Sequence, residues 1–203
     1  MKKGVKLWAM PSVLVVALSQ GGCGSSGNNI VLLRNTGSGS ITACFTVNRT
    51  VNFALAASNV PANGTAYTRR TAGPMTYNGQ AVTGNSSFVT SGNKSYTLSR
   101  YWTVTSNGVR LIATVAYTGV YPGGTFLPQN MAPGQTVTDA KGGSPHTFIG
   151  FETIRLVGKT FANTCHFKRF TVDGQAVEEW IAPGYGQVKQ IFIDEILQYN
   201  GDL

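Results

Sequence analysis

Residues 148–193 read FIGFETIRLVGKTFANTCHFKRFTVDGQAVEEWIAPGYGQVKQIFI, and this stretch decides the fold class. Asp173-Gly174 suits the two positive-φ positions of a tight hairpin turn. Pro183-Gly184 ends a strand, because proline donates no ladder hydrogen bond. Four segments of the stretch alternate polar and apolar side chains with a period of two. They are residues 150–156, 165–172, 175–181 and 187–193. The stretch therefore predicts an antiparallel meander of four strands.

The preceding chain predicts a second meander, over residues 30–118. Asn107-Gly108 is a turn signal between two β-rich segments, so we expect a hairpin over residues 98–117. Residues 50–57 suit either a strand or a helical turn, and a strand is favoured. The other candidate strands are residues 30–34, 41–49, 65–70 (an edge strand), 88–90 and 95–105, with turns at residues 61–64, Gly73-Pro74 and Asn78-Gly79.

Two segments differ from this pattern. Residues 119–145 are rich in Gly and Pro and predict a long irregular connection, which is either a functional loop or a plain crossover between the meanders. Residues 193–199, IDEILQY, suit one or two helical turns, and we expect no other helix. The predicted fold class is mainly β: a single antiparallel curved sheet or half-barrel built from two β-meanders, with little helix.

The first residues have the composition of a leader. Lys2, Lys3 and Lys6 precede an apolar run at residues 7–18, which is shorter than the roughly 20 residues of a spanning helix. Small residues follow, and then Cys23. This arrangement resembles a bacterial lipoprotein signal.

That resemblance implies a signal peptide over residues 1–22 and a lipid on Cys23. It also implies a flexible tether over residues 23–29 and a single β-domain over residues 30–203. The protein would then be anchored to the periplasmic face of the outer membrane. Plain secretion after cleavage near Gly22, to a periplasmic or secreted location, is the alternative.

Three cysteines are an odd number for a secreted chain. If Cys23 carries lipid, Cys44 and Cys165 remain as a pair, and an oxidising compartment permits a disulfide between them. The bridge would join the first strand of the domain to the central hairpin, and two buried free thiols are the alternative. A metal site of Cys165 with His166 is not expected, because adjacent residues on a strand point to opposite faces.

Charge is unevenly distributed along a chain of net charge +8. Residues 23–138 contain no Asp or Glu, and all eight acidic residues lie at or after Asp139. The basic part could face an anionic lipid or cell-wall polymer, whereas ordinary solvated arginines are the alternative. Basic and aromatic residues do not interleave as in nucleic-acid-binding proteins, so we expect no nucleic acid as a partner.

The sequence shows no pattern of catalytic residues. A hydrolase using Glu152 or Glu178 would need two carboxyl groups roughly 5–10 Å apart, whereas Glu178 and Glu179 are adjacent on a strand and diverge. His146 and His166 are few for a metal site. No serine elbow, phosphate loop or dinucleotide fingerprint is present. We therefore expect no enzyme activity, no metal and no cofactor.

Aromatic residues provide the remaining candidate site. Trp102, Tyr117, Tyr121, Trp180 and Tyr185 could line one concave face of the sheet and hold an apolar ligand. An ordinary β-protein core would contain the same residues.

The C-terminal stretch also resembles a known pattern, over roughly residues 117–193. Gly158-Lys159-Thr160-Phe161, followed by Cys165, and Glu179-Trp180-Ile181-Ala182-Pro183-Gly184-Tyr185-Gly186-Gln187-Val188-Lys189 resemble a group of functionally uncharacterised bacterial envelope proteins. Ile181 stands where that group usually has Tyr. The resemblance implies an antiparallel sheet, similar in outline to the lipoprotein-carrier half-barrels, and it implies no catalytic residues. We expect an envelope protein that binds an apolar ligand or maintains the envelope, or else a module that binds an envelope protein through an aromatic patch or a sheet edge.

Overall fold

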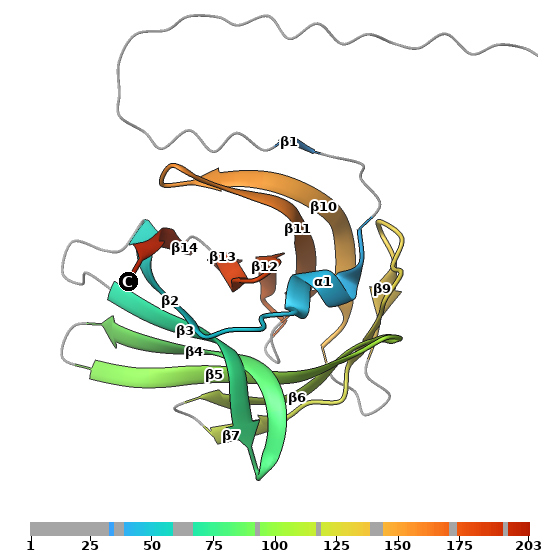
Figure 1. The fold of residues 1–203 in the computed structure, drawn as a ribbon, viewed down its shortest axis with the longest axis horizontal. Helices are drawn as coiled ribbons and strands as arrows, with labels where there is room; N and C mark the ends of the chain where they lie inside the picture. The colour runs from blue at the N-terminus through green and yellow to red at the C-terminus, as the bar shows by residue number, and fades with distance from the viewer. Residues whose placement is uncertain are drawn as a thin grey trace, which may run out of the picture.

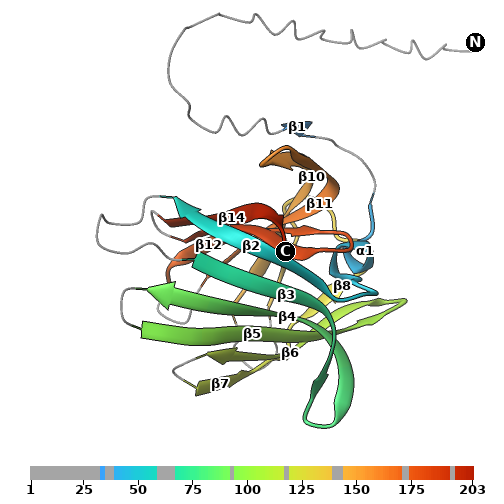
Figure 2. The same ribbon diagram turned by 60° about the vertical axis from the view of Figure 1, so that its left-hand side comes forward.

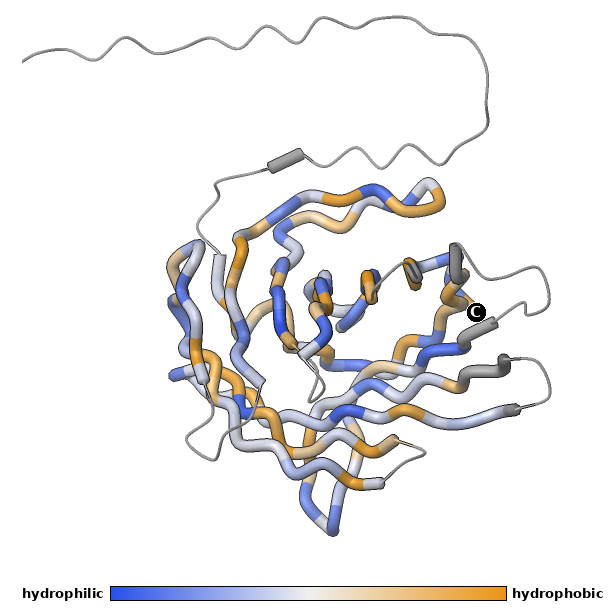
Figure 3. Tube along the Cα trace, turned by 180° about the vertical axis from the view of Figure 1, so that it is seen from behind, coloured by the Kyte–Doolittle hydropathy of each residue, from blue (hydrophilic) through white to orange (hydrophobic). Residues whose placement is uncertain are grey.

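Antiparallel β-strands form a single open, curved sheet in the computed structural model (Figure 1). The structure describes residues 33–34, 39–58, 67–91, 94–116, 119–138, 144–170, 174–192 and 195–203. The mainly β fold class that the sequence predicts is confirmed. Apolar and polar residues alternate along many of the strands, as Figure 3 shows.

Fourteen strands and one short helix, α1 (Ile41–Phe45), make up the described chain. The strands are β1 (Leu33–Arg34), β2 (Val51–Ser58), β3 (Tyr67–Tyr77), β4 (Gln80–Ser91), β5 (Lys94–Thr105), β6 (Gly108–Ala116), β7 (Gly119–Pro122), β8 (Phe126–Pro128), β9 (Thr136–Val137), β10 (His146–Leu156), β11 (Lys159–Phe170), β12 (Ala176–Ala182), β13 (Gly186–Phe192) and β14 (Glu195–Asp202).

Two meanders meet inside the sheet, because the order of strands is β1-β10-β11-β12-β13-β14-β2-β3-β4-β5-β6-β7. The last strand of the chain, β14, pairs antiparallel with β2, and Tyr199 lies opposite Leu55. The sheet rolls so that β12 and β13 lie between the β10–β11 hairpin and the β2–β6 meander (Figures 1 and 2). Both faces of β12 are therefore covered, and its burial is nearly continuous over its second half.

The two faces of β12 contribute to two apolar clusters. Trp180 packs with Phe53, Leu55 and Tyr199 in the first cluster. Its neighbour Ile181 packs in the second cluster, which includes Phe45, Trp102 and Phe167. Successive side chains on a strand point to opposite faces, so strand β12 separates the two clusters.

The prediction of a strand at residues 41–49 is wrong, because the structure has α1 there. Ile41, Cys44 and Phe45 are the buried residues of α1, and their i, i+3, i+4 spacing is that of a helix face. The helix packs against β5, β6, β11 and β12. Burial of its apolar face in the second cluster stabilises the helical conformation over a strand.

Strand β3 is longer than predicted and does not lie at an edge. It pairs with β2 on one side and with β4 on the other. It also runs through Gly73-Pro74, where a turn was expected. Pairing with β2 ends at Ala72. Pro74 has no N–H to donate, and β2 does not need one from it at that position.

Residues 195–202 are a strand and not the helical turns predicted for residues 193–199. Strand β14 bonds to β13 on one side and β2 on the other. Pairing on both sides overrides a weak local preference, because β-propensity depends strongly on tertiary context. Tyr199 is buried in the first apolar cluster.

Other predictions are confirmed. The β5–β6 hairpin has Thr105 opposite Gly108, and Asn78-Gly79 turns β3 into β4. The connection 119–145, by contrast, was predicted to be irregular, and its described part contains three short strands: β7 and β8 pair with β6, and β9 pairs with β10.

The predicted Cys44–Cys165 disulfide is present, with Cα atoms 6.0 Å apart. It ties α1, and not a first strand, to β11. Among the described residues, no helix is long and apolar enough to cross a membrane. Cys23, the tether and the turn at residues 61–64 lie outside the described residues.

Candidate functional site

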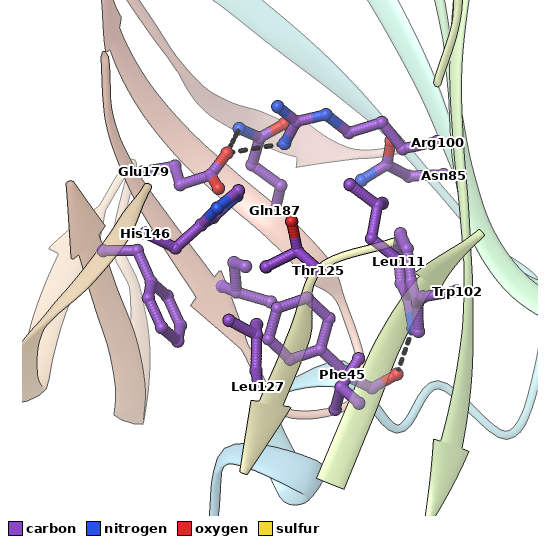
Figure 4. A pocket seen from close by; sticks show the side chains of 13 residues that line it. Phe45, Asn85, Arg100, Trp102, Leu111, Thr125, Leu127, His146, Glu179 and Gln187 are labelled. Atoms are coloured by element: carbon purple, nitrogen blue, oxygen red, sulfur yellow. Dashed lines mark hydrogen bonds and ion pairs between the residues drawn. The ribbon is translucent and has the colours of Figure 1, made fainter. Parts of the chain in front are cut away.

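A cavity of about 40 Å³ lies inside the rolled sheet, between the β4–β6 strands and the β10–β13 strands (Figure 4). A single water molecule needs roughly 10–15 Å³ of cavity volume on this scale, so the cavity has room for a small molecule of a few heavy atoms. Its polar side chains come from six separate places in the sequence: Asn85, Arg100, Thr125, His146, Glu179 and Gln187.

Most of the cavity wall is apolar. Phe45 of α1, Trp102 of β5, Leu127 of β8 and Phe167 of β11 supply much of it. The indole N–H of Trp102 donates to the carbonyl oxygen of Phe45 at 2.8 Å, so the polar atom of this side chain is satisfied. The cavity is thus an apolar space with polar groups gathered at one end, as Figure 4 shows.

Glu179 is the centre of that polar end. Its Oε2 lies 2.6 Å from Nη1 of Arg100 and accepts a hydrogen bond of 2.9 Å from the amide of Gln187. Burial alone would raise the pKa of Glu179, but the charges of Arg100 and Arg169 outweigh it and lower the pKa to about 2. Glu179 is therefore an anion at neutral pH.

Two further arginines lie near this polar end, and one of them, Arg169, is close to the same carboxylate. Nε of Arg169 lies 3.5 Å from Oε2 of Glu179. Arg70 is 3% exposed, and it donates to the Ser87 hydroxyl at 2.8 Å and to the Gln187 carbonyl at 2.6 Å. Burial, and then the charge of Arg100, lowers the pKa of both arginines, to about 9 for Arg70 and about 10 for Arg169. Both remain cations at neutral pH.

His146 completes the polar end from the start of β10. Its Nδ1 lies 2.9 Å from the carbonyl oxygen of Ser144. A carbonyl only accepts, so Nδ1 carries the proton. Burial lowers the pKa of His146 below its ordinary value, so the ring is neutral at pH 7.

The aromatic residues proposed from the sequence do not share one surface. Trp102 lines the cavity. Trp180 and Tyr185 belong to the other apolar cluster, behind β12. Tyr121, on β7, is 44% exposed, and Tyr117 lies outside the described residues.

A second buried polar group lies behind β12. Nδ1 of His166 is 3.0 Å from Oε1 of Glu152, and its Nε2 is 3.1 Å from Oε2 of Glu178. The Trp180 indole donates to Oε2 of Glu152 at 2.7 Å and stacks on the His166 ring. Both ring nitrogens of His166 are engaged by carboxylates, and Glu152 is 4% exposed, so this group is held within the fold.

Among the described residues, no three His, Cys, Asp or Glu side chains are placed to hold a metal ion. Comparisons with protein-family models, with curated proteins and with solved structures find no match to this chain.

Sequence reasoning missed most of the polar end. It expected the basic part of the chain, which includes Arg70 and Arg100, either to face an anionic polymer or to be solvated, whereas Arg70 is buried and Arg100 lines the cavity. One signal was available, because all the acidic residues lie after the basic part of the chain. Buried arginines in the first meander can therefore be paired only by acids from the second.

Proposed function

We propose that this chain is a lipid-anchored protein of the bacterial cell envelope that binds a small ligand in the cavity and catalyses no reaction. The cavity beside Arg100 and Glu179 carries the binding proposal, because it combines an apolar wall with convergent polar groups, as ligand sites do. The leader that ends at Cys23 supports the anchor. The location that follows is the periplasmic face of the outer membrane.

Native mass spectrometry of the full chain, purified in mild detergent, tests the binding proposal. We expect a small molecule that leaves on gentle activation, and a reduced signal in Trp102→Ala, which changes the cavity wall. A clean apo mass under conditions that preserve the fold would argue against a stored ligand.

The anchor is tested with a clickable palmitate analogue fed to cells that express the protein. Label should appear on the wild-type chain and on the matched variant Ser25→Ala, and it should be absent from Cys23→Ser. Equal labelling of Cys23→Ser would contradict the anchor.

A second candidate function is a protein-interaction module that uses the sheet edge at β7. This strand is last in the sheet order and all four of its residues are exposed, including Val120 at 58%. A photocrosslinking amino acid at Val120 should then capture an envelope protein. The same amino acid at Val157, which is 57% exposed in the β10–β11 turn, is the control.

A further inference from the structure

The arginines at and near the polar end of the cavity carry more positive charge than Glu179 balances. We call Arg70, Arg100 and Arg169 the arginine cluster. Among the residues that the structure describes, Glu179 is the only carboxylate ion-paired with this cluster. Three cations and one anion leave a formal charge of +2 in this cluster, since 3 − 1 = 2.

The hydrogen-bond partners of the cluster do not remove this excess. Arg70 donates to a hydroxyl and a backbone carbonyl, which are both neutral. Arg100 and Arg169 share the same oxygen of Glu179. The buried Nε of Arg169 lies 3.5 Å from Oε2 of Glu179 and has no closer hydrogen-bond partner among the described residues. A buried cation without a counter-ion is strongly unfavourable, so the cluster calls for a second anion.

Arg100 is the member of the arginine cluster that lines the cavity, so the cavity is where a second anion can meet the cluster directly. A phosphate or sulfate presents acceptor oxygens on all sides and would leave several of them against apolar walls. A carboxylate on a short aliphatic chain has one polar end, which matches a cavity that is polar at one end and lined by Trp102, Leu127 and Phe167 elsewhere.

We propose that the cavity binds a small aliphatic monocarboxylate, with its carboxylate at Arg100, the arginine of the cluster that lines the cavity, and its chain against Trp102 and Leu127. This inference rests on the proposed binding function and names the class of ligand. Only a few heavy atoms fit, so the chain is short.

Isothermal titration of the full chain in mild detergent tests the proposal with four probes: propionate, its neutral isostere propionamide, octanoate and inorganic phosphate. Propionate should bind, and the other three probes should bind at least about tenfold more weakly. For propionamide this is the scale of one lost charge pair. Octanoate is too long for the cavity, and phosphate would leave oxygens against its apolar wall. Equal binding of propionamide would overturn the anion. Equal or tighter binding of phosphate or octanoate would overturn the short monocarboxylate.

Adjacent arginines on β3 provide a matched pair of variants. Arg70 is buried and donates to the carbonyl of Gln187, whose side chain lines the cavity, whereas Arg69 is exposed on the opposite face. Arg70→Gln should weaken propionate binding at least about tenfold, and Arg69→Gln should leave it unchanged. Arg169→Gln provides a second test if Arg70→Gln does not fold, which circular dichroism will show.

The results separate the two proposals. A neutral co-purifying molecule in native mass spectrometry, with no propionate binding, keeps the binding function and overturns the monocarboxylate. If neither a co-purifying molecule nor propionate binding is found, both are overturned.

Discussion

Adjacent residues of the same type have different roles in this protein. Glu179 faces the cavity and pairs with Arg100, while Glu178 contacts His166 on the other face of β12. The sequence prediction that these two carboxylates diverge is confirmed. Arg69 and Arg70 differ in the same way, because strand geometry sends neighbours to opposite faces.

Glu179→Gln should lower the free energy of unfolding at pH 7 by about 3–5 kcal/mol, because Arg100 and Arg169 lose their counter-ion. The Glu179 carboxyl has an ordinary pKa of 4.5 and a pKa of about 2 in the fold. Its stabilisation is therefore complete above pH 4.5 and is lost as the pH falls towards 2. Denaturant unfolding at several pH values should show that the free energy of unfolding falls less between pH 4.5 and 2 in the variant than in the wild type. A variant as acid-sensitive as the wild type would contradict this assignment.

The two buried tryptophans also differ in their partners. Trp180 donates to the carboxylate of Glu152, whereas Trp102 donates to a backbone carbonyl. Bonds to charged groups contribute about 1.5–3 kcal/mol and neutral ones about 0.5–1.5. Trp180→Phe should therefore destabilise the fold more than Trp102→Phe in urea unfolding. If Trp102→Phe destabilises the fold more than Trp180→Phe, the hydrogen bond from the Trp180 indole to Glu152 is not the stronger of the two.

At the scale of elements, the C-terminal strand depends on contacts outside its ladder. Lys159 of β11 donates to the Tyr185 hydroxyl and to Oδ2 of Asp202, the latter at 2.7 Å. Its ammonium lies 4.1 Å from the centroid of the Tyr185 ring and 5.3 Å from that of Tyr199. Burial would lower the pKa of Lys159, but the bonds to Asp202 and Tyr185 raise it. These contacts hold the end of β14 against the β10–β11 hairpin.

Lys159→Met should speed amide hydrogen exchange at residues 199–203 and leave the β5–β6 hairpin unchanged. The loss of global stability should stay under about 1 kcal/mol, because Asp202 is 57% exposed and water screens the pair. Lys168→Met, on the same strand, is the matched control. Unchanged exchange at the C-terminal end in Lys159→Met would contradict the role of these contacts.

At the scale of the whole molecule, long-range links hold the roll together. The β14–β2 ladder joins the ends of the two meanders. The Cys44–Cys165 disulfide joins α1 to β11 across 121 residues. The disulfide joins two segments that both line the cavity, because α1 supplies Phe45 and β11 supplies Phe167.

Replacing both cysteines by serine should lower the free energy of unfolding by on the order of 4 kcal/mol, because a loop of this length loses much entropy when closed. Guanidinium unfolding with and without a reductant measures the effect. Reductant should destabilise the wild type and leave the double variant unchanged. Equal stability of the two proteins without reductant would contradict the role of the bridge.

The sequence by itself determined the features that depend on neighbouring residues. Period-two alternation and turn signals predicted the β class and the β5–β6 hairpin, and the count of cysteines predicted the disulfide. The sequence also named Trp102, one wall of the cavity.

Only the tertiary structure decided the rest, because the forces there act between distant segments. The apolar cluster around Phe45 made residues 41–45 helical, and pairing with β2 made residues 195–202 a strand. Burial of Arg70 and Arg100 against Glu179 required two meanders to meet. No local pattern marks an arginine as buried, since Glu179 lies 79 positions after Arg100 in the chain and contacts it only after the sheet has rolled.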